Sequence, residues 1–390
     1  MDGVNRFYRA VRKSDLTTKD TKSTKVNCRG ERFFAPTLII RNLRVLRDLR
    51  GENSFPFACG FAALGPFVIA SLLLMPLVAW EIFAATAPIT VRVGYPQPSG
   101  AQLPLWVMSE AKLDQKYGFD LQSIYISGGA RLAQTLVSGD IDMATTGGAV
   151  INAVLSGAEL VYIALIVPTF GFSLYARPEL KDVSALKGKV VGVMTKGASS
   201  DHGLVALLRH NKLVPGQDVK FLYLGGVREA LAALERGIVS ASVLSAPTTL
   251  VARRLGFKEV VNIATLKLPY VHNGLVARRA LTRQQPERVK AFLRGYIAAV
   301  KVSNEEPQLS KRALARFLAT NDAAIVDEAY DSFRGIFPKV PYFTEDNIRA
   351  VLSVADHPKA ASADPKDFFD NRFVKELEDT GFIKELYGQR

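Results

Sequence analysis

The stretch SGDIDMATTGGAVINAVLSG, residues 138–157, links two expected helices through a very short strand. The first helix ends at Gly139, the strand covers 142–146, and the second helix covers 147–157. Two threonines and two glycines stand where the strand ends. Small, hydroxylated and flexible residues at that place are typical of a strand-to-helix turn. They would also leave the backbone bare for a ligand to touch.

Strands and helices alternate on both sides of this stretch. Strands are expected over 89–95, 119–126, 142–146 and 160–167, and helices over 104–118, 130–139 and 147–157. The pattern then restarts, with strands over 189–194, 219–224 and 241–245 and helices over about 200–212, 228–237 and 247–256. Such alternation predicts an α/β fold of mainly parallel sheets flanked by helices.

The second series of elements echoes the first. LVSG over 136–139 is matched by LERG over 234–237, and GGAR over 128–131 by GGVR over 225–228. A repeat of about a hundred residues is too long for a solenoid. The sequence therefore predicts two similar α/β lobes.

These patterns divide the chain into five expected parts. Residues 1–52 form a basic extension expected to be disordered, and 53–87 form a signal sequence or membrane anchor. The first lobe is expected over 88–176 and the second over 177–271. Residues 272–390 are expected to return to the first lobe through a strand from Gly274 and to end as a helical cap.

The N-terminal region carries the pattern of an export segment. Four arginines between 41 and 50 precede an apolar run that reaches the roughly 20 residues needed to span a bilayer. The small residues Ala85-Thr86-Ala87 are typical of a cleavage site, although Pro88 directly after them would hinder cleavage. A cleaved signal and an uncleaved anchor therefore both stay open. Either one places residues 88–390 on the far side of the membrane, in the periplasm or another extracytoplasmic space, because the positive charges stay inside.

Composition excludes several classes of function. The net charge is +13, but no dense run of Lys and Arg is present, so no nucleic-acid partner is expected. Both cysteines, Cys28 and Cys59, precede the exported part, which therefore has no thiol or disulfide chemistry. The four histidines form no H-x-x-x-H or H-x-H pair, so neither a metal site nor a cofactor is expected.

Six strand-to-helix loops are the candidate ligand site. Ligands of open α/β sheets bind beyond the carboxyl ends of the strands, and free N–H groups at helix N-termini favour an anionic or strongly polar ligand. Any one loop is better explained as a turn or a helix cap, whereas six loops converging on one cleft favour a ligand. The residues expected to contact it are Gln97, Pro98, Ser99, Gly129, Ala130, Thr145, Thr146, Gly147, Lys196, Gly197, Ser199, Ser200, Gly226, Ser245 and Asn273.

Two short motifs resemble those of enzymes but lack the residues or the geometry that catalysis would need. GVMTKGAS over 192–199 has the glycine spacing of a P-loop, yet Ala198 stands where the phosphate-binding lysine is required. SSDH over 199–202 contains the residue types of a hydrolase triad, but successive helical residues point about 100° apart. A helix cap explains SSDH better, and no catalytic residue is assigned.

Four segments together resemble the periplasmic substrate-binding proteins of ABC importers, of the nitrate/sulfonate/taurine and thiamine-pyrimidine-precursor type. They are VRVGYPQPSGAQLPLWVMSEAKLDQKYGFDLQ, SGGARLAQTLVSGDIDMATTGG, DVSALKGKVVGVMTKGASSD and GGVREALAALERGIVSASVLSAP, in that order along the chain. The resemblance implies a two-lobed periplasmic-binding-protein fold of type II with the ligand in the cleft between the lobes. In that fold, residues 145–147 would line the first-lobe wall of the cleft.

The resemblance also implies a function. It predicts a non-enzymatic, monomeric solute-binding protein that takes a sulfonate-, nitrate- or pyrimidine-like molecule and works with an ABC permease and ATPase. It would meet the membrane only through its N-terminal segment or the permease. Two alternatives remain, an enzyme of the same fold (pyrimidine-precursor synthase-like or lyase-like) and a membrane-tethered ligand sensor. One relative of the first kind uses a cysteine-rich motif, and the exported part of this chain has no cysteine.

Overall fold

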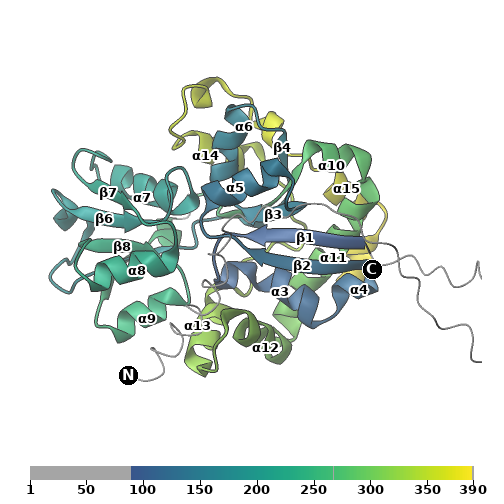
Figure 1. Cartoon of the computed structure of the whole chain (residues 1–390), viewed down its shortest axis with the longest axis horizontal. Coiled ribbons are helices and arrows are strands. Elements are labelled where there is room, and N and C mark those ends of the chain that lie inside the picture. Colours follow the sequence, from purple (N-terminus) through teal and green to yellow (C-terminus); the bar gives the residue numbers. More distant parts are fainter. Residues whose placement is uncertain (1–88, 267, 389–390) are drawn as a thin grey trace, which may run out of the picture. The chain divides into compact units, whose positions relative to one another are not determined.

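The computed structural model describes residues 89–388, apart from residue 267 (Figure 1). This part contains two five-stranded sheets with flanking helices and belongs to one compact unit. The extension over 1–52 and the export segment over 53–87 lie outside the described residues. Among the helices of the described part, none combines the length and the apolar character that crossing a membrane requires.

The first sheet has the strand order β2-β1-β3-β10-β4. Its strands are β1 (Ile89–Tyr95), β2 (Phe119–Tyr125), β3 (Met143–Thr146), β4 (Leu160–Val167) and β10 (Asn273–Arg278). β1 is parallel to both β2 and β3, whereas β10 runs antiparallel between β3 and β4. Every residue of β4 is buried, as expected for a continuous apolar run covered on both faces.

Helices connect the parallel strands of the first sheet. They are α3 (Leu103–Glu110), α4 (Leu113–Lys116), α5 (Gly129–Ser138) and α6 (Ala149–Leu155). The single helix expected over 104–118 is wrong, because Lys112 adopts a left-handed conformation with φ 54° and separates α3 from α4. The buried carboxylate of Asp114 then accepts hydrogen bonds from the backbone N–H groups of Gln115 and Leu121, which ties α4 to the start of β2.

The second sheet repeats the topology of the first. Its order is β7-β6-β8-β5-β9, with β5 (Ser173–Ala176), β6 (Val190–Val193), β7 (Lys220–Tyr223), β8 (Ala241–Leu244) and β9 (Lys258–Asn262). Its helices are α7 (Ser199–His210), α8 (Val227–Glu235) and α9 (Thr248–Arg254). β5 takes the antiparallel place that β10 takes in the first sheet. The sequence repeat therefore corresponds to a repeated strand order.

One strand lies in a different sheet from the one expected. Residues 173–176 were assigned to the first lobe, but they form β5, which pairs with β8 and β9 of the second sheet. The chain therefore leaves the first sheet between Val167 and Ser173. It returns between Asn262 and Asn273, through the short turn η4 (Ile263–Leu266). The strand expected from Gly274 is confirmed as part of the first sheet.

Helices dominate the chain after β10, as expected. They are α10 (Arg279–Gln284), α11 (Pro286–Glu305), α12 (Pro307–Leu318), α13 (Ala323–Phe333), α14 (Glu345–Leu352), α15 (Arg372–Asp379) and α16 (Phe382–Leu386). α11 and α12 pack on α3 of the first sheet. There, the ring of Trp106 stacks on Phe317 at 5.3 Å between centroids.

Candidate functional site

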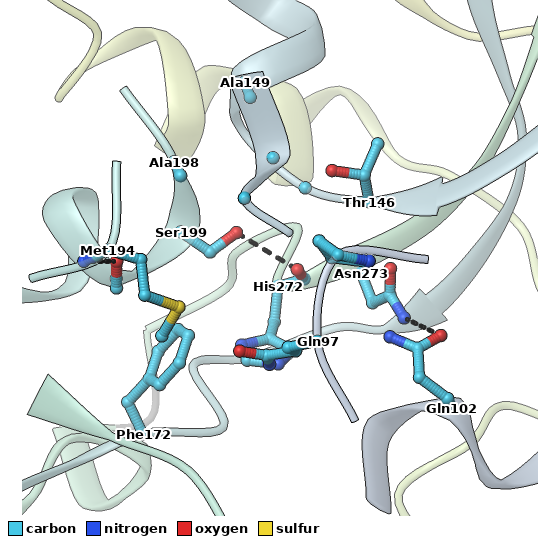
Figure 2. Close-up of a pocket in the computed structure, with 15 residues that line it drawn as sticks. Gln97, Gln102, Thr146, Ala149, Phe172, Met194, Ala198, Ser199, His272 and Asn273 are labelled. Carbon is cyan, nitrogen blue, oxygen red and sulfur yellow. Dashed lines mark hydrogen bonds between the residues drawn. The ribbon is translucent and has the colours of Figure 1, made fainter. Parts of the chain in front are cut away.

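A small pocket is lined by residues of the first sheet, of loops and helix starts that follow strands of both sheets, and of both segments that cross between the sheets (Figure 2). Its lining residues are Pro96, Gln97, Gln102, Gly128, Gly129, Thr146, Gly147, Ala149, Phe172, Met194, Ala198, Ser199, Ser200, His272 and Asn273. The volume open to water-sized groups is about 30 Å³. One water needs roughly 10–15 Å³ by this measure, so the pocket has room for about two.

The structure brings part of the expected site together. Gln97, Gly129, Thr146, Gly147, Ser199, Ser200 and Asn273 all line the pocket. They come from loops that follow β1, β2, β3 and β6 and from the start of β10. Asn273 reaches the pocket because β10 pairs with β3, with Gly274 opposite Thr146. Of the six loops expected to converge, those after β1, β2, β3 and β6 reach the pocket, whereas those after β7 and β8 do not.

The other expected residues do not line this pocket. They are Pro98, Ser99, Ala130, Thr145, Lys196, Gly197, Gly226 and Ser245. Ser99 caps the short turn η2 (Gly100–Gln102), where its Oγ accepts from the N–H of Ala101. Lys196 points outward, with 65% of its side chain exposed and its Nζ 2.7 Å from Asp356 Oδ2. The N–H of Gly197 donates to Asp201 Oδ2 at 2.8 Å, inside the turn that begins α7.

A second cavity of about 250 Å³ lies against the edge of the second sheet. Ser245 lines it, together with residues of β5, α9, β9 and α13. The guanidinium of Arg253 donates to Tyr175 Oη at 2.9 Å and pairs with Glu328 at 2.8 Å across this cavity. Of the two cavities, only the smaller one is reached by strand-to-helix loops of both repeats.

Gly147 and Gly148, the two glycines that follow β3, lie in close contact with other parts of the chain. A Cβ atom on Gly147 would lie 2.1 Å from Ser199 Oγ and 2.5 Å from the carbonyl oxygen of His272. A Cβ on Gly148 would lie 2.6 Å from Tyr270 Oη. The backbone after β3 is bare because α7 and the returning segment press against it. A turn and a ligand contact were the two explanations for these glycines in the sequence. The close approach of neighbouring segments is a third.

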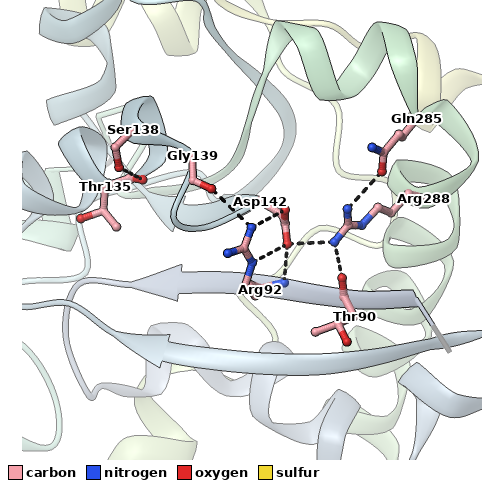
Figure 3. Close-up of polar contacts among 8 residues, drawn as sticks. All are labelled: Thr90, Arg92, Thr135, Ser138, Gly139, Asp142, Gln285 and Arg288. Atoms are coloured by element: carbon pink, nitrogen blue, oxygen red, sulfur yellow. Dashed lines mark hydrogen bonds and ion pairs between the residues drawn. The ribbon is translucent and has the colours of Figure 1, made fainter. Parts of the chain in front are cut away.

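The opposite end of β3 is held by a buried carboxylate (Figure 3). Asp142, with 4% of its side chain exposed, pairs with Arg92 of β1 at 3.2 Å and with Arg288 of α11 at 2.9 Å. Burial opposes ionisation, but hydrogen bonds from Arg92 and the charge of Arg288 outweigh it and lower the pKa of Asp142. This end of the strand is therefore structural, and the threonine–glycine end faces the pocket.

An amide network shapes the first-sheet side of the pocket. Asn273 Nδ2 lies 3.4 Å from both the carbonyl oxygen of Ala101 and Gln102 Oε1. The same Gln102 oxygen accepts from Thr145 Oγ1 at 2.7 Å. Asn273 Oδ1 and Gln97 Oε1 are buried and have no hydrogen-bond partner. Buried polar atoms without partners are uncommon in proteins and call for an explanation.

His272 is neutral and offers a donor. Its Nδ1 accepts from the N–H of Gly171 at 3.1 Å, so the ring proton belongs on Nε2. Burial lowers the pKa of His272 to about 3. Beside it, His202 Nδ1 lies 2.7 Å from Tyr270 Oη, and burial lowers the pKa of His202 to about 4. The returning segment is thus fixed to α7 by uncharged side chains.

Several lining residues were missed by sequence reasoning. They are Pro96, Gln102, Gly128, Ala149, Phe172, Met194, Ala198 and His272. Phe172 and His272 lie on the segments that cross between the sheets, where no alternation of strand and helix marks the chain. Gln102 carried a usable signal, because it is a polar residue directly before the apolar run of α3.

Comparison with known proteins agrees with this architecture. An ABC transporter periplasmic binding protein of Brachyspira hyodysenteriae is 22% identical over 286 residues, which cover 68% of this chain and 80% of the relative. The alkanesulfonate-binding protein of Xanthomonas axonopodis, solved with MOPS, has a TM-score of 0.60 at 22% identity and covers 69% of this chain and 92% of its own. The nitrate-binding protein of Synechocystis has a TM-score of 0.62 at 16% identity, over 75% of this chain and 88% of its own.

The expected periplasmic-binding-protein fold is thereby confirmed. The profile of the NMT1-like family matches residues 84–319, which is more than half of the chain. This protein therefore belongs to the NMT1-like family.

Proposed function

We propose that this protein is the solute-binding component of an ABC import system. Two lobes, built on the first and second sheets, would close on a small polar solute and deliver it to a permease and an ATPase. The observation that carries the proposal is the pocket, because loops of both repeats and both crossing segments contribute to its wall. A ligand held by both lobes stabilises their closed arrangement, which is the usual device of hinged binding proteins.

The similar proteins support this class of function. The relative from Brachyspira is an ABC transporter periplasmic binding protein, and two proteins of the same fold bind alkanesulfonate and nitrate. We propose a solute of comparable size that reaches the protein in the periplasm. We also propose that the protein is a monomer and meets the membrane only through its N-terminal segment or the permease.

The polar groups of the pocket support binding rather than catalysis. Ser199 Oγ donates to the carbonyl oxygen of His272 at 3.1 Å, so its proton is held by a backbone acceptor rather than by a general base. The imidazole Nδ1 of His272 is occupied by a backbone N–H. Among residues 89–388, no group of three His, Cys, Asp or Glu side chains is placed to hold a metal ion. We therefore propose that the protein is not an enzyme.

A solute screen tests the proposal. Full-length protein is heated with sulfonates, nitrate, carboxylates, amides and pyrimidines, and the melting temperature is recorded for each. A ligand at a hundred times its Kd should stabilise the protein by about 2.7 kcal/mol. Uptake of the stabilising solute is then compared in cells with and without the gene. The proposal fails if no solute stabilises the protein, or if uptake does not depend on the gene.

A further inference from the structure

Two buried oxygens of residues that line the pocket, Asn273 Oδ1 and Gln97 Oε1, have no hydrogen-bond donor in the structure. The orientation of Asn273 is set by its neighbours, because its Nδ2 faces the carbonyl oxygen of Ala101 and Gln102 Oε1, both at 3.4 Å. Turning the amide over would place oxygen against oxygen. Asn273 Oδ1 therefore remains a buried acceptor without a donor. With Gln97 Nε2 donating to Ser99 Oγ at 3.4 Å, Gln97 Oε1 is a second acceptor without a donor, on a residue that lines the same pocket.

The charges around the pocket do not suit a bare oxyanion. No Lys, Arg, Asp or Glu is among the described residues that line the pocket. The cation expected there, Lys196, is paired with Asp356 at the surface. The positive end of α7 already faces a carboxylate, because Asp201 lies in its first turn and is buried. An anion entering the pocket would lose its hydration without gaining a countercharge.

The pocket also offers donors of its own. His272 presents an Nε2–H, because its Nδ1 is engaged by Gly171. The helix α5 begins at the pocket wall, and its N-cap, Gly128, makes no side-chain capping bond. Its first N–H groups have no partner within the helix. The complementary ligand group therefore needs an acceptor as well as donors, no negative charge, and a size near that of about two water molecules.

We propose that the pocket takes the uncharged amide- or urea-type group of a small solute, with its N–H groups on Gln97 Oε1 and Asn273 Oδ1 and its oxygen towards the start of α5. This inference rests on the proposed function and deepens it by naming the class of solute. It separates this protein from the nitrate- and alkanesulfonate-binding proteins that share its fold.

Pairs of equal shape test the proposal directly. Urea is compared with nitrate, and acetamide with acetate, each at 20 mM with the full-length protein at matched ionic strength. Urea and acetamide should raise the melting temperature by at least about 2 °C, and the two anions should leave it within about 0.5 °C of a sodium chloride control. N,N-dimethylacetamide keeps the carbonyl but lacks the N–H donors, so it should have no effect.

Adding a negative charge at Gln97 tests whether urea binds in this pocket. Gln97→Glu keeps an acceptor at this position and adds a negative charge, and its neighbour Ser99 Oγ, 3.4 Å from Gln97 Nε2, can turn to donate. Guanidinium has the planar shape of urea but only donors and a positive charge. The variant should shift preference from urea to guanidinium by at least about fivefold. Gln122→Glu, on the exposed surface of β2, adds the same charge elsewhere and should change nothing.

The results that would overturn the proposal are distinct. The proposal is wrong if nitrate stabilises the protein as much as urea does, or acetate as much as acetamide. It is also wrong if neither urea nor acetamide has an effect at 100 mM. The wild-type comparison decides even if Gln97→Glu does not fold. Binding of an oxyanion that is lost in the Ser199→Trp variant would refute the proposed amide class of solute. It would leave the proposed function, solute binding, intact. The proposed function fails separately, when the broad screen yields no solute at all.

Discussion

Replacing Gly147 by alanine should hold the two lobes apart. The new Cβ would lie 2.1 Å from Ser199 Oγ, 2.5 Å from the carbonyl oxygen of His272 and 2.6 Å from that of Val271. The serine hydroxyl can rotate away, but the two carbonyl oxygens belong to the backbone and cannot. Overpacking of this kind costs about 1–3 kcal/mol. The contact with Ser199 joins the loop after β3 to α7 and so affects the closed arrangement, whereas the contacts with the returning segment, whose His272 N–H is bonded to Val167 of β4, also affect the ligand-free fold.

The expected result is a loss of affinity together with a loss of stability of the ligand-free protein that does not exceed about 3 kcal/mol. A penalty of 1–3 kcal/mol on the binding-competent state raises Kd by about 5- to 150-fold. Isothermal titration calorimetry with the solute found in the screen measures Kd, and differential scanning calorimetry measures the stability of the ligand-free protein. Gly203→Ala is the matched control in α7, since its Cβ would meet Phe170 Cδ1 at 3.3 Å, a contact that a small shift relieves. Wild-type affinity in Gly147→Ala would refute the reasoning.

Four further outcomes concern other parts of the chain. Asp142→Asn should lower stability by about 2 kcal/mol, because it leaves the half-buried Arg92 and the largely buried Arg288 without their carboxylate, whereas the exposed Asp140→Asn should cost less than about 0.5 kcal/mol; differential scanning calorimetry measures both. The folded-state pKa of Asp142 is lowered. Its contribution to the free energy of unfolding is therefore complete above the unfolded pKa of about 3.9 and is lost as pH falls through the lower folded pKa. The pKa values of His202 and His272 are lowered to about 4 and about 3, so stability should fall as pH drops below the unfolded value of about 6.5, with a slope approaching 2.7 kcal/mol per pH unit for two protons. Replacing either histidine by glutamine should halve that slope in pH-dependent denaturation. Ser199→Trp should abolish solute binding in calorimetry and also lower the melting temperature of the ligand-free protein, because Ser199 is buried against Gly147 and the carbonyl oxygen of His272; unchanged binding would place the site elsewhere. Mass spectrometry of the mature protein should show either a start just after the apolar run or an intact anchor in the membrane fraction, and a soluble protein that keeps the whole apolar run would contradict both.

The repeated alternation of strands and helices was readable because several parallel strands are short apolar runs and the helices α5, α6, α8 and α9 are each followed closely by a glycine. Gly139 and Gly237 have φ values of 89° and 73°, which explains why both repeats keep glycine there. The crossing strand β5 was not recognised. It has only four residues, Ser173–Ala176, and its partners β8 and β9 lie far along the chain. Local patterns cannot reveal such pairing.

The candidate site was predictable only in part, for a related reason. Sequence reasoning found residues such as Thr146 and Ser199, which stand where a strand ends or a helix begins. It could not place side chains that turn away, such as Lys196, whose partner Asp356 is 160 positions further along the chain. Phe172 and His272 reach the pocket because two crossing segments pass beside each other, which depends on the assembled fold.

A crystal structure of the protein with its stabilising solute tests the central claim most directly. The account predicts electron density for the solute between the loops of the two sheets, with donors of the solute within 3.2 Å or so of Gln97 Oε1 and Asn273 Oδ1. It also predicts that Gly147 remains in contact with Ser199 in that complex. Solute found in the larger cavity beside Arg253, or bound to one sheet alone, would contradict the account.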